Sequence, residues 1–127
     1  MPTILVLDDD PADNALIRRI VTDSAYPLLT SKNVNEFQLL MVRQPVDLAI
    51  ISLTTISETD IENLQRILRR TPETKVIALA PSQHGNGLTT LLRAESLQAH
   101  HLLAKPIDPQ QLLTILNLAF PLSSQQG

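Results

Sequence analysis

The sequence predicts an α/β protein in which five parallel strands are covered by helices on both faces, a three-layer αβα sandwich. Short apolar runs recur along the chain, and they are too continuous to leave one side of a strand in water. Segments with apolar residues at helical spacing alternate with these runs. Right-handed crossovers between parallel strands then place helices on both faces of the sheet.

The apolar runs that predict strands are short, and residues that favour turns or caps bound each of them. They occupy residues 4–7, 26–31, 47–52, 75–80 and 101–104. Pro27 fits the start of the second strand, where a missing N–H is tolerated. The only glycine-rich stretch, 81–87, follows the fourth strand and is expected to be the most mobile loop.

Five helices are predicted from apolar spacing and from cap residues. They occupy residues 11–23, 34–44, 59–70, 88–97 and 109–119. Aspartate followed by proline, at Asp10 and at Asp108, is a plausible N-cap and first helical residue. Thr59 and Glu62 have the spacing of a capping box for the third helix. Leucines at 88, 91, 92 and 97 predict the fourth helix.

Length and composition limit the function classes. A chain of 127 residues fits one domain, expected over 1–120, and the polar residues 121–127 are expected to be a flexible tail or the start of a linker. A net charge of -3 and 2% aromatic residues argue against nucleic-acid and anionic-membrane binding. Without cysteine there is no disulfide framework, and without a signal peptide or long apolar run the protein is expected in the cytoplasm.

Charged residues collect where strands end. Asp8, Asp9 and Asp10 follow the first strand directly, and Lys105 follows the fifth. In open α/β sheets, ligands bind outside the carboxyl ends of the strands. Two carboxylates about 4 Å apart repel by up to about 4 kcal/mol at an effective dielectric constant of about 20. The cluster therefore calls for a cation, either a metal ion or a lysine.

These landmarks resemble the receiver domain of bacterial two-component response regulators: the acidic pair Asp8 and Asp9, Asp47 opening the third strand, and Lys105 with Pro106 after the fifth. The resemblance covers nearly the whole chain. It implies a flavodoxin-like (βα)5 fold with strand order 2-1-3-4-5 and a phospho-accepting aspartate at the end of strand three. It also implies that the acidic pair binds Mg²⁺ and that the lysine contacts the phosphoryl group. A Ser or Thr after strand four and an aromatic residue on strand five would form the switch.

Three positions depart from the family pattern. Counting from Asp47 places Ser52 where the family has its phosphoacceptor aspartate. Ala80 takes the place of the Ser or Thr, and Leu102 that of the aromatic residue. Asp47 cannot replace the missing aspartate, because five residues at about 3.3 Å each put it at the other end of the sheet. Asp60, in or before the third helix, is also a poor substitute.

We therefore expect a non-enzymatic pseudo-receiver, a protein-interaction module that works without aspartyl phosphorylation. Phosphotransfer requires an ionised carboxylate nucleophile, and a serine hydroxyl is weak without a base. Lys105 is expected to neutralise Asp8 or Asp9, with no cofactor required. One alternative is a phosphorelay receiver that is still switched. The switch would be either Mg²⁺ binding at Asp8 and Asp9 or phosphorylation of Ser52.

A second alternative is a small haloacid dehalogenase-like phosphatase. The apolar run into Asp8 and Asp10 resembles the first motif of that family, and Ser52 and Lys105 would supply the second and third. The further acidic pair that those enzymes use for magnesium is missing after residues 75–80. We expect no phosphatase activity.

The partner of a receiver-like module is expected to be a protein of a signalling pathway. By the family resemblance, the binding face is formed by the fourth helix, the fifth strand and the fifth helix. Its candidate residues are Leu88, Leu92, His101 and Leu102. The same face could form a homodimer. His100 and His101 point to opposite faces of a strand and are therefore a poor metal chelate.

Overall fold

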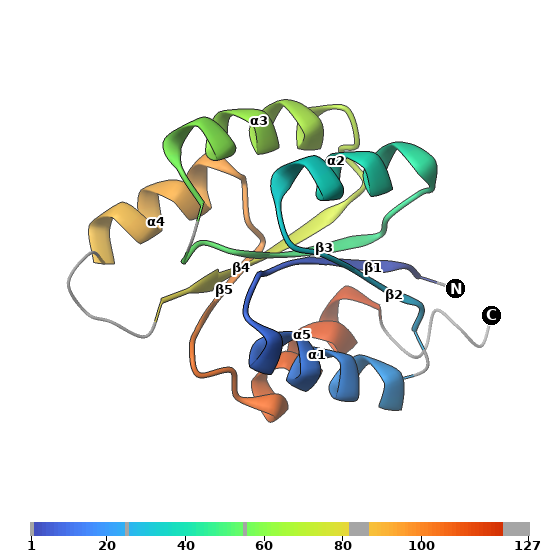
Figure 1. The fold of residues 1–127 in the computed structure, drawn as a ribbon. Coiled ribbons are helices and arrows are strands. Elements are labelled where there is room, and N and C mark those ends of the chain that lie inside the picture. The colour runs from blue at the N-terminus through green and yellow to red at the C-terminus, as the bar shows by residue number, and fades with distance from the viewer. Residues whose placement is uncertain (1, 25, 55, 82–86, 121–127) are drawn as a thin grey trace.

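The computed structural model describes residues 2–24, 26–54, 56–81 and 87–120, and its elements alternate strictly between strand and helix (Figure 1). The strands are β1 (Ile4–Leu7), β2 (Leu28–Ser31), β3 (Leu48–Ser52), β4 (Lys75–Ala80) and β5 (His101–Ala104). The helices are α1 (Pro11–Asp23), α2 (Val34–Arg43), α3 (Glu58–Arg69), α4 (Gly87–Ser96) and α5 (Pro109–Ala119). The glycine-rich loop and the C-terminal tail singled out above lie mostly or wholly outside the described residues.

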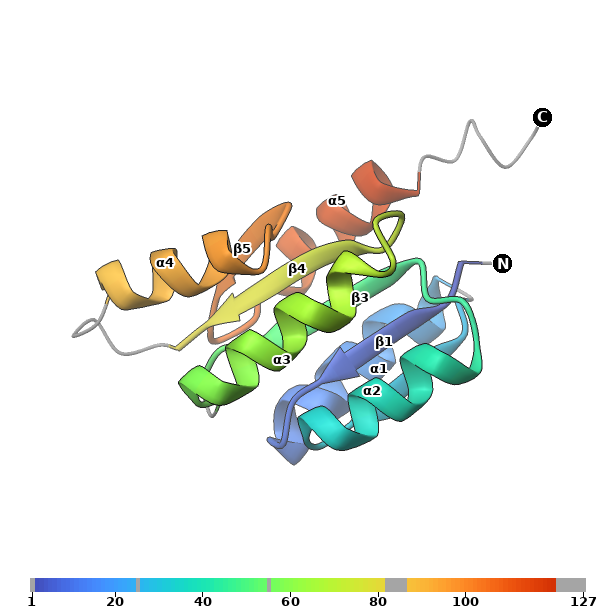
Figure 2. The same ribbon diagram turned by 90° about the horizontal axis from the view of Figure 1, so that it is seen from above.

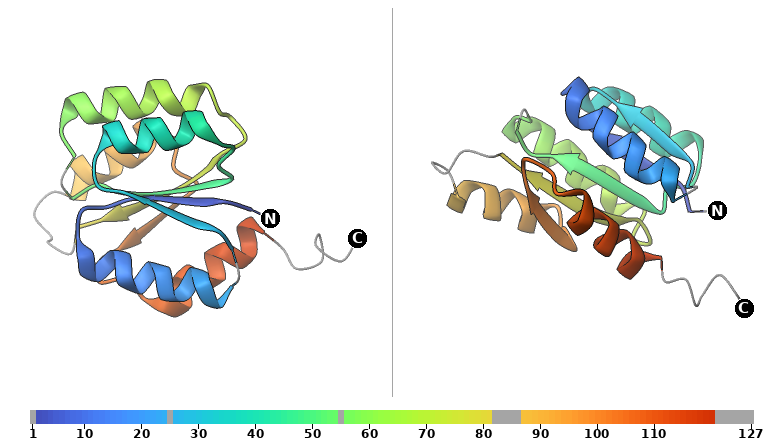
Figure 3. Two further views of the ribbon diagram at one scale, coloured as in Figure 1. Left: turned by 45° about the vertical axis from the view of Figure 1, so that its right-hand side comes forward. Right: turned by 90° about the horizontal axis from the view of Figure 1, so that it is seen from below.

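The five strands form one parallel sheet in the order β2-β1-β3-β4-β5. Helices α1 and α5 cover one face, and α2, α3 and α4 cover the other (Figures 1 and 3). This confirms the predicted three-layer αβα sandwich with flavodoxin-like strand order. In the register of the sheet, Leu7 is opposite Ile51, and Ser52 is opposite Leu79. Asp8 and Ser52 therefore lie at neighbouring positions of the carboxyl edge.

Two apolar layers, one on each face of the sheet, form the core. Along β1, Leu5 and Leu7 belong to the layer under α2 and α3, whereas Ile4 and Val6 belong to the layer over α1 and α5. All four side chains are buried, because successive strand residues point to opposite faces and both faces are covered. This explains why the central strands are apolar without alternation.

Helix α3 begins earlier than the sequence predicts. Its N-cap is Ser57, whose hydroxyl accepts a hydrogen bond from the Asp60 amide at 3.1 Å, while the Asp60 carboxylate accepts one from the Ser57 amide at 3.1 Å. The expected box of Thr59 and Glu62 was therefore wrong. Both pairs have the required spacing, and the earlier one adds acidic residues to the first turn, where they favour the helix dipole.

Helix α4 exposes the leucines that predict it. Leu88, Leu91 and Leu92 face solvent, and the residues that α4 buries are Thr90 and Ala94. Leu97, just beyond the helix, does enter the core. The helix was correctly predicted, but its buried side is formed by these small residues and its leucines are on the outer side.

Gln98 follows α4 in the left-handed region, with φ of 56°. Since a side chain there costs roughly 1 kcal/mol and glycine is the usual residue at such helix ends, Gln98→Gly is expected to raise the free energy of unfolding by about 0.5–1 kcal/mol, measured by urea denaturation. Gln38→Gly, on the exposed side of α2, is the matched control. It should destabilise by about 1 kcal/mol. Destabilisation by Gln98→Gly as well would show that the backbone there is unstrained.

Candidate functional site

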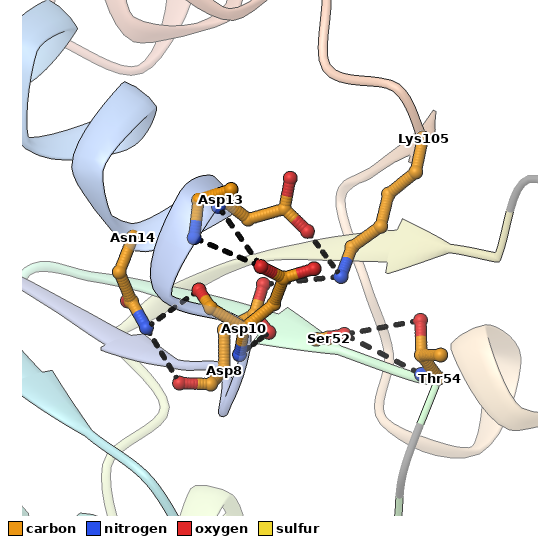
Figure 4. Close-up of polar contacts among 8 residues, drawn as sticks. Asp8, Asp10, Asp13, Asn14, Ser52, Thr54 and Lys105 are labelled. Carbon is orange, nitrogen blue, oxygen red and sulfur yellow. Dashed lines mark hydrogen bonds and ion pairs between the residues drawn. The ribbon is translucent and has the colours of Figure 1, made fainter.

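Asp8 is the buried carboxylate of the carboxyl edge. It follows β1, and its backbone amide donates to the Ser31 carbonyl of β2 at 3.1 Å. Its side chain is fully removed from solvent. One carboxylate oxygen, Oδ1, accepts a hydrogen bond from the Asp10 amide at 3.0 Å, and the other, Oδ2, accepts one from Lys105 Nζ at 3.2 Å (Figure 4).

Lys105 binds two carboxylates at once. Its Nζ lies 3.2 Å from Asp8 Oδ2 and 2.8 Å from Asp13 Oδ2, and 12% of its side chain is exposed. Lys105 comes from the end of β5, whereas Asp13 comes from the first turn of α1 (Figure 4). The structure thus brings together Asp8 and Lys105, as the sequence suggests. Asp9 is exposed, and its place in the charge cluster is taken by Asp13.

The turn between β1 and α1 is held by its own polar side chains. Asn14 Nδ2 donates to the carbonyl of Asp8 at 2.8 Å and to that of Asp10 at 3.1 Å. The carboxylate of Asp10 accepts from the Ala12 amide at 2.9 Å, as expected of an N-cap. These bonds direct the first turn of α1 toward the strand ends, which places Asp13 beside Lys105.

Burial dominates the protonation of Asp8. Desolvation raises the pKa of Asp8 above its usual value of 3.8, although the Asp10 amide and Lys105 oppose this shift. Burial alone would lower the pKa of Lys105, but the hydrogen bond to Asp13 and the charge of Asp8 leave it above the usual 10.5. The lysine is therefore a fixed cation, and Asp8 is the carboxylate whose charge is less favourable in the fold.

Ser52 ends β3 and is 1% exposed as a residue. Its hydroxyl donates to Thr54 Oγ1 at 3.3 Å and accepts from the Thr54 amide at 3.4 Å (Figure 4). Among the described residues, no carboxylate accepts a hydrogen bond from this hydroxyl. No base is thus in place to activate Ser52 as a nucleophile.

A small cavity of about 180 Å³ adjoins Asp8, Asp9 and Ser52. Asp60 also lines it, closer to the site than the sequence suggests, but the Asp60 carboxylate is engaged in capping α3. Asp47 lies at the opposite end of β3, as expected, and accepts a hydrogen bond from the Thr3 amide at 2.8 Å.

The positions proposed as a switch lie on two neighbouring strands, the inner strand β4 and the edge strand β5. Ala80 ends β4 opposite Ala104, and Leu102 lies on β5 opposite Ala78. Ala80 has no hydroxyl, and the partly exposed side chain of Leu102 has no ring. Neither residue lines the cavity next to Ser52.

The donors at this edge fit Mg²⁺ poorly. Magnesium is bound by carboxylate, substrate and water oxygens in octahedral geometry. Both oxygens of Asp8 already accept hydrogen bonds, Ser52 offers a neutral oxygen, and Asp9 supplies the remaining free carboxylate of the acidic pair. Over the described part of the chain, no group of three or more Asp, Glu, His or Cys residues is arranged to hold a metal ion.

Comparison with known proteins places the chain in a family. The model of the response regulator receiver domain matches residues 4–117. This chain belongs to that family. A receiver domain is a signalling module of two-component pathways and not a classical enzyme, so the haloacid dehalogenase alternative loses its support. None of the described helices is long and apolar enough to cross a membrane.

The relatives of this receiver domain include regulators that are much longer than this chain. It is 24% identical to the hydrogenase transcriptional regulatory protein HoxA of Cupriavidus necator, over 98% of this chain and 25% of that protein. It is 25% identical to the response regulator protein PilR of Pseudomonas aeruginosa, over 97% of this chain and 27% of that protein. The chain thus spans about a quarter of the length of these relatives. A CheY-like receiver domain protein of Methanospirillum hungatei has the same fold, with a TM-score of 0.82, 19% identity, and coverage of 100% of this chain and 99% of that one.

Asp8→Asn is expected to stabilise this receiver domain at pH 7 by about 1 kcal/mol, because it removes a buried charge while Lys105 keeps Asp13. The pKa of Asp8 is raised in the fold, so the folded state holds this proton to a higher pH than the unfolded chain does. The contribution of the carboxyl group to stability therefore falls as the pH rises from the ordinary value through the raised one.

Thermal unfolding of Asp8→Asn and wild type from pH 4 to pH 7 checks this expectation. The advantage of the variant should be greatest at pH 7 and should shrink toward pH 4. Asp9→Asn, at the exposed neighbouring carboxylate, is the control and should change the melting temperature little. Destabilisation by Asp8→Asn at pH 7 would mean that its bond to Lys105 outweighs desolvation.

Proposed function

We propose that this receiver domain signals as a protein-interaction module that is not switched by aspartyl phosphorylation. The observation that carries the proposal is Ser52 at the end of β3, on the carboxyl edge beside Asp8. The family resemblance expects an aspartate at this position. The Ser52 hydroxyl is almost fully buried and is hydrogen-bonded to Thr54, so it is neither ionised nor presented to a phosphodonor.

The remaining charges at this edge support a structural role. Lys105 is engaged by Asp8 and Asp13 without any phosphoryl group. Ala80 and Leu102 offer no hydroxyl or aromatic ring to respond to one. On this proposal, Asp8, Asp13 and Lys105 are kept as an internal charge cluster that joins β1 and α1 to the end of β5.

Incubation with acetyl phosphate and millimolar Mg²⁺ tests the first half of the proposal. Intact-mass spectrometry should show no phosphoryl adduct on this chain, while an ordinary receiver domain treated in parallel is labelled. An acid-labile, hydroxylamine-sensitive adduct would contradict the proposal.

The two alternatives can be measured on the same protein. Magnesium-dependent NMR shifts at Asp8 and Asp9 would support metal switching, and an acid-stable phosphoester at Ser52 would support serine phosphorylation.

The face formed by α4, β5 and α5 is the proposed docking surface for a protein partner. Leu88, Leu91, Leu92 and Leu102 are exposed there, at 72%, 56%, 55% and 38%, and we call these four residues the leucine face. Helix α4 and strand β5 lie at the same side of the molecule (Figure 2). His101, on β5, is half-buried beside this face.

Charge is sparse around the leucine face. Between residues 87 and 120, the charged residues are Arg93, Glu95, Lys105 and Asp108, and α5 carries none. Arg93 and Lys105 are already engaged in ion pairs. An exposed apolar set with little charge nearby suits a partner with a complementary apolar surface. A second copy of the chain would satisfy the same requirement.

Substitution of Leu91 and Leu92 by serine is expected to abolish partner capture from a lysate of the source organism. Apolar anchors at the centre of an interface typically cost 2 kcal/mol or more when truncated, roughly 30-fold in affinity. The matched control replaces Leu39 and Val42, the exposed apolar residues of α2, and should leave capture unchanged. Sedimentation of the purified chain separates a homodimer from a different partner. Unchanged capture by the Leu91 and Leu92 variant would exclude this face.

A further inference from the structure

Arg93 joins helix α4 to the residues between β3 and α3. Its Nη1 donates to the Ile56 carbonyl at 2.8 Å, and its Nη2 donates to Glu58 Oε1 at 2.9 Å. The Arg93 side chain is 21% exposed, whereas that of Glu58 is 77% exposed. The bond to the Ile56 carbonyl is therefore the one shielded from solvent. The exposed ion pair with Glu58 contributes less to stability.

Helix α4 has few apolar contacts to hold it in place. The residues that it buries, Thr90 and Ala94, are small, and its leucines face outward. A second polar contact lies near its C-terminal end, where Gln65 Nε2 of α3 donates to the Ser96 carbonyl at 3.1 Å. Because burial of small side chains supplies little stabilisation, these polar contacts have an unusually large share in positioning α4.

The other end of the Arg93 contact reaches the cavity beside Ser52. Ile56 is buried and lines this cavity together with Asp8 and Ser52. Thr54, two residues before Ile56, is hydrogen-bonded to the Ser52 hydroxyl. A displacement of Ile56 would thus change the surroundings of Ser52 at the cavity and the hydrogen bond from Arg93.

We propose that Arg93 is a latch that couples the cavity beside Ser52 to the leucine face of α4. With its guanidinium on the Ile56 carbonyl and Glu58, α4 is held in the position described. A change at the cavity that moves Ile56 releases α4, and a partner that moves α4 shifts Ile56 and the hydroxyl pair of Ser52 and Thr54. This regulation rests on the proposed function for its biological meaning, since the leucine face is the proposed docking surface.

Amide NMR on the full chain tests the latch without any partner. In Arg93→Gln, the amides of Ser52 and Thr54 should shift, and hydrogen exchange of α4 should accelerate on the order of tenfold, because a bond to a charged donor is lost. Arg66→Gln, at an exposed arginine of α3, is the matched control and should change neither. Faster exchange in α4 with unmoved Ser52 and Thr54 would overturn the coupling, and no change at either place would overturn the latch.

A second pair of variants tests transmission from the opposite direction. Leu92→Gly loosens α4 from its exposed side and should shift the amides of Ser52 and Thr54. Compared with Arg93→Gln alone, the double variant should show no further shift of these amides. A further shift caused by Leu92→Gly in the Arg93→Gln background would contradict the proposal. Should Arg93→Gln lose the protection of β1 and β3 as well, Arg93→Lys replaces it, since a lysine keeps the charge but lacks the planar fork needed for both contacts.

Glu58→Gln separates the two contacts of Arg93. It removes the exposed ion pair and leaves the bond to the Ile56 carbonyl, so α4 exchange should change less than twofold. An effect as large as that of Arg93→Gln would show that the ion pair, and not the shielded carbonyl, holds the helix, and the proposed route through Ile56 would fail. Partner capture and acetyl phosphate labelling are independent measurements, so failure of the proposed function is distinguishable from failure of the latch.

Discussion

The buried carboxylate of Asp8 is the constraint around which the carboxyl edge of the sheet is organised. A carboxylate without solvent must have a cation or a proton. Lys105 supplies the cation from 97 residues further along the chain. Because Asp13 binds the same ammonium group, the loop after β5 is tied to both β1 and α1. One ion-pair cluster thus joins the first strand, the first helix and the last crossover.

Local patterns were sufficient to predict most of the fold. β4 and β5 begin and end where predicted, and so do α1 and α5, because their apolar runs or their Asp-Pro caps mark the boundaries. The orientation of α4 was not predictable in this way. A leucine stripe gives the period of a helix, but the side that is buried is decided by the packing of the whole fold. In α4 the buried residues are Thr90 and Ala94.

The candidate site was predictable as far as strand ends determine it. Asp8 and Lys105 follow their strands directly, so parallel topology brings them to one edge. The position of Asp13 depends on the direction in which α1 leaves the strand. This direction is set by the Asn14 hydrogen bonds to the carbonyls of Asp8 and Asp10. The exposure of Asp9 follows from the same turn. Such contacts arise from the folded geometry and leave no clear spacing in the sequence.

A neutral residue at position 52 changes the charge balance of this edge. An aspartate there would add a negative charge beside Asp8, and the repulsion would call for a divalent cation. With Ser52, one lysine faces two close carboxylates. The negative charge that Lys105 has to balance is therefore smaller by one than it would be with an aspartate at position 52. If metal and phosphoryl group are no longer required, contacts such as that of Arg93 with Ile56 become the means by which this edge and α4 influence each other.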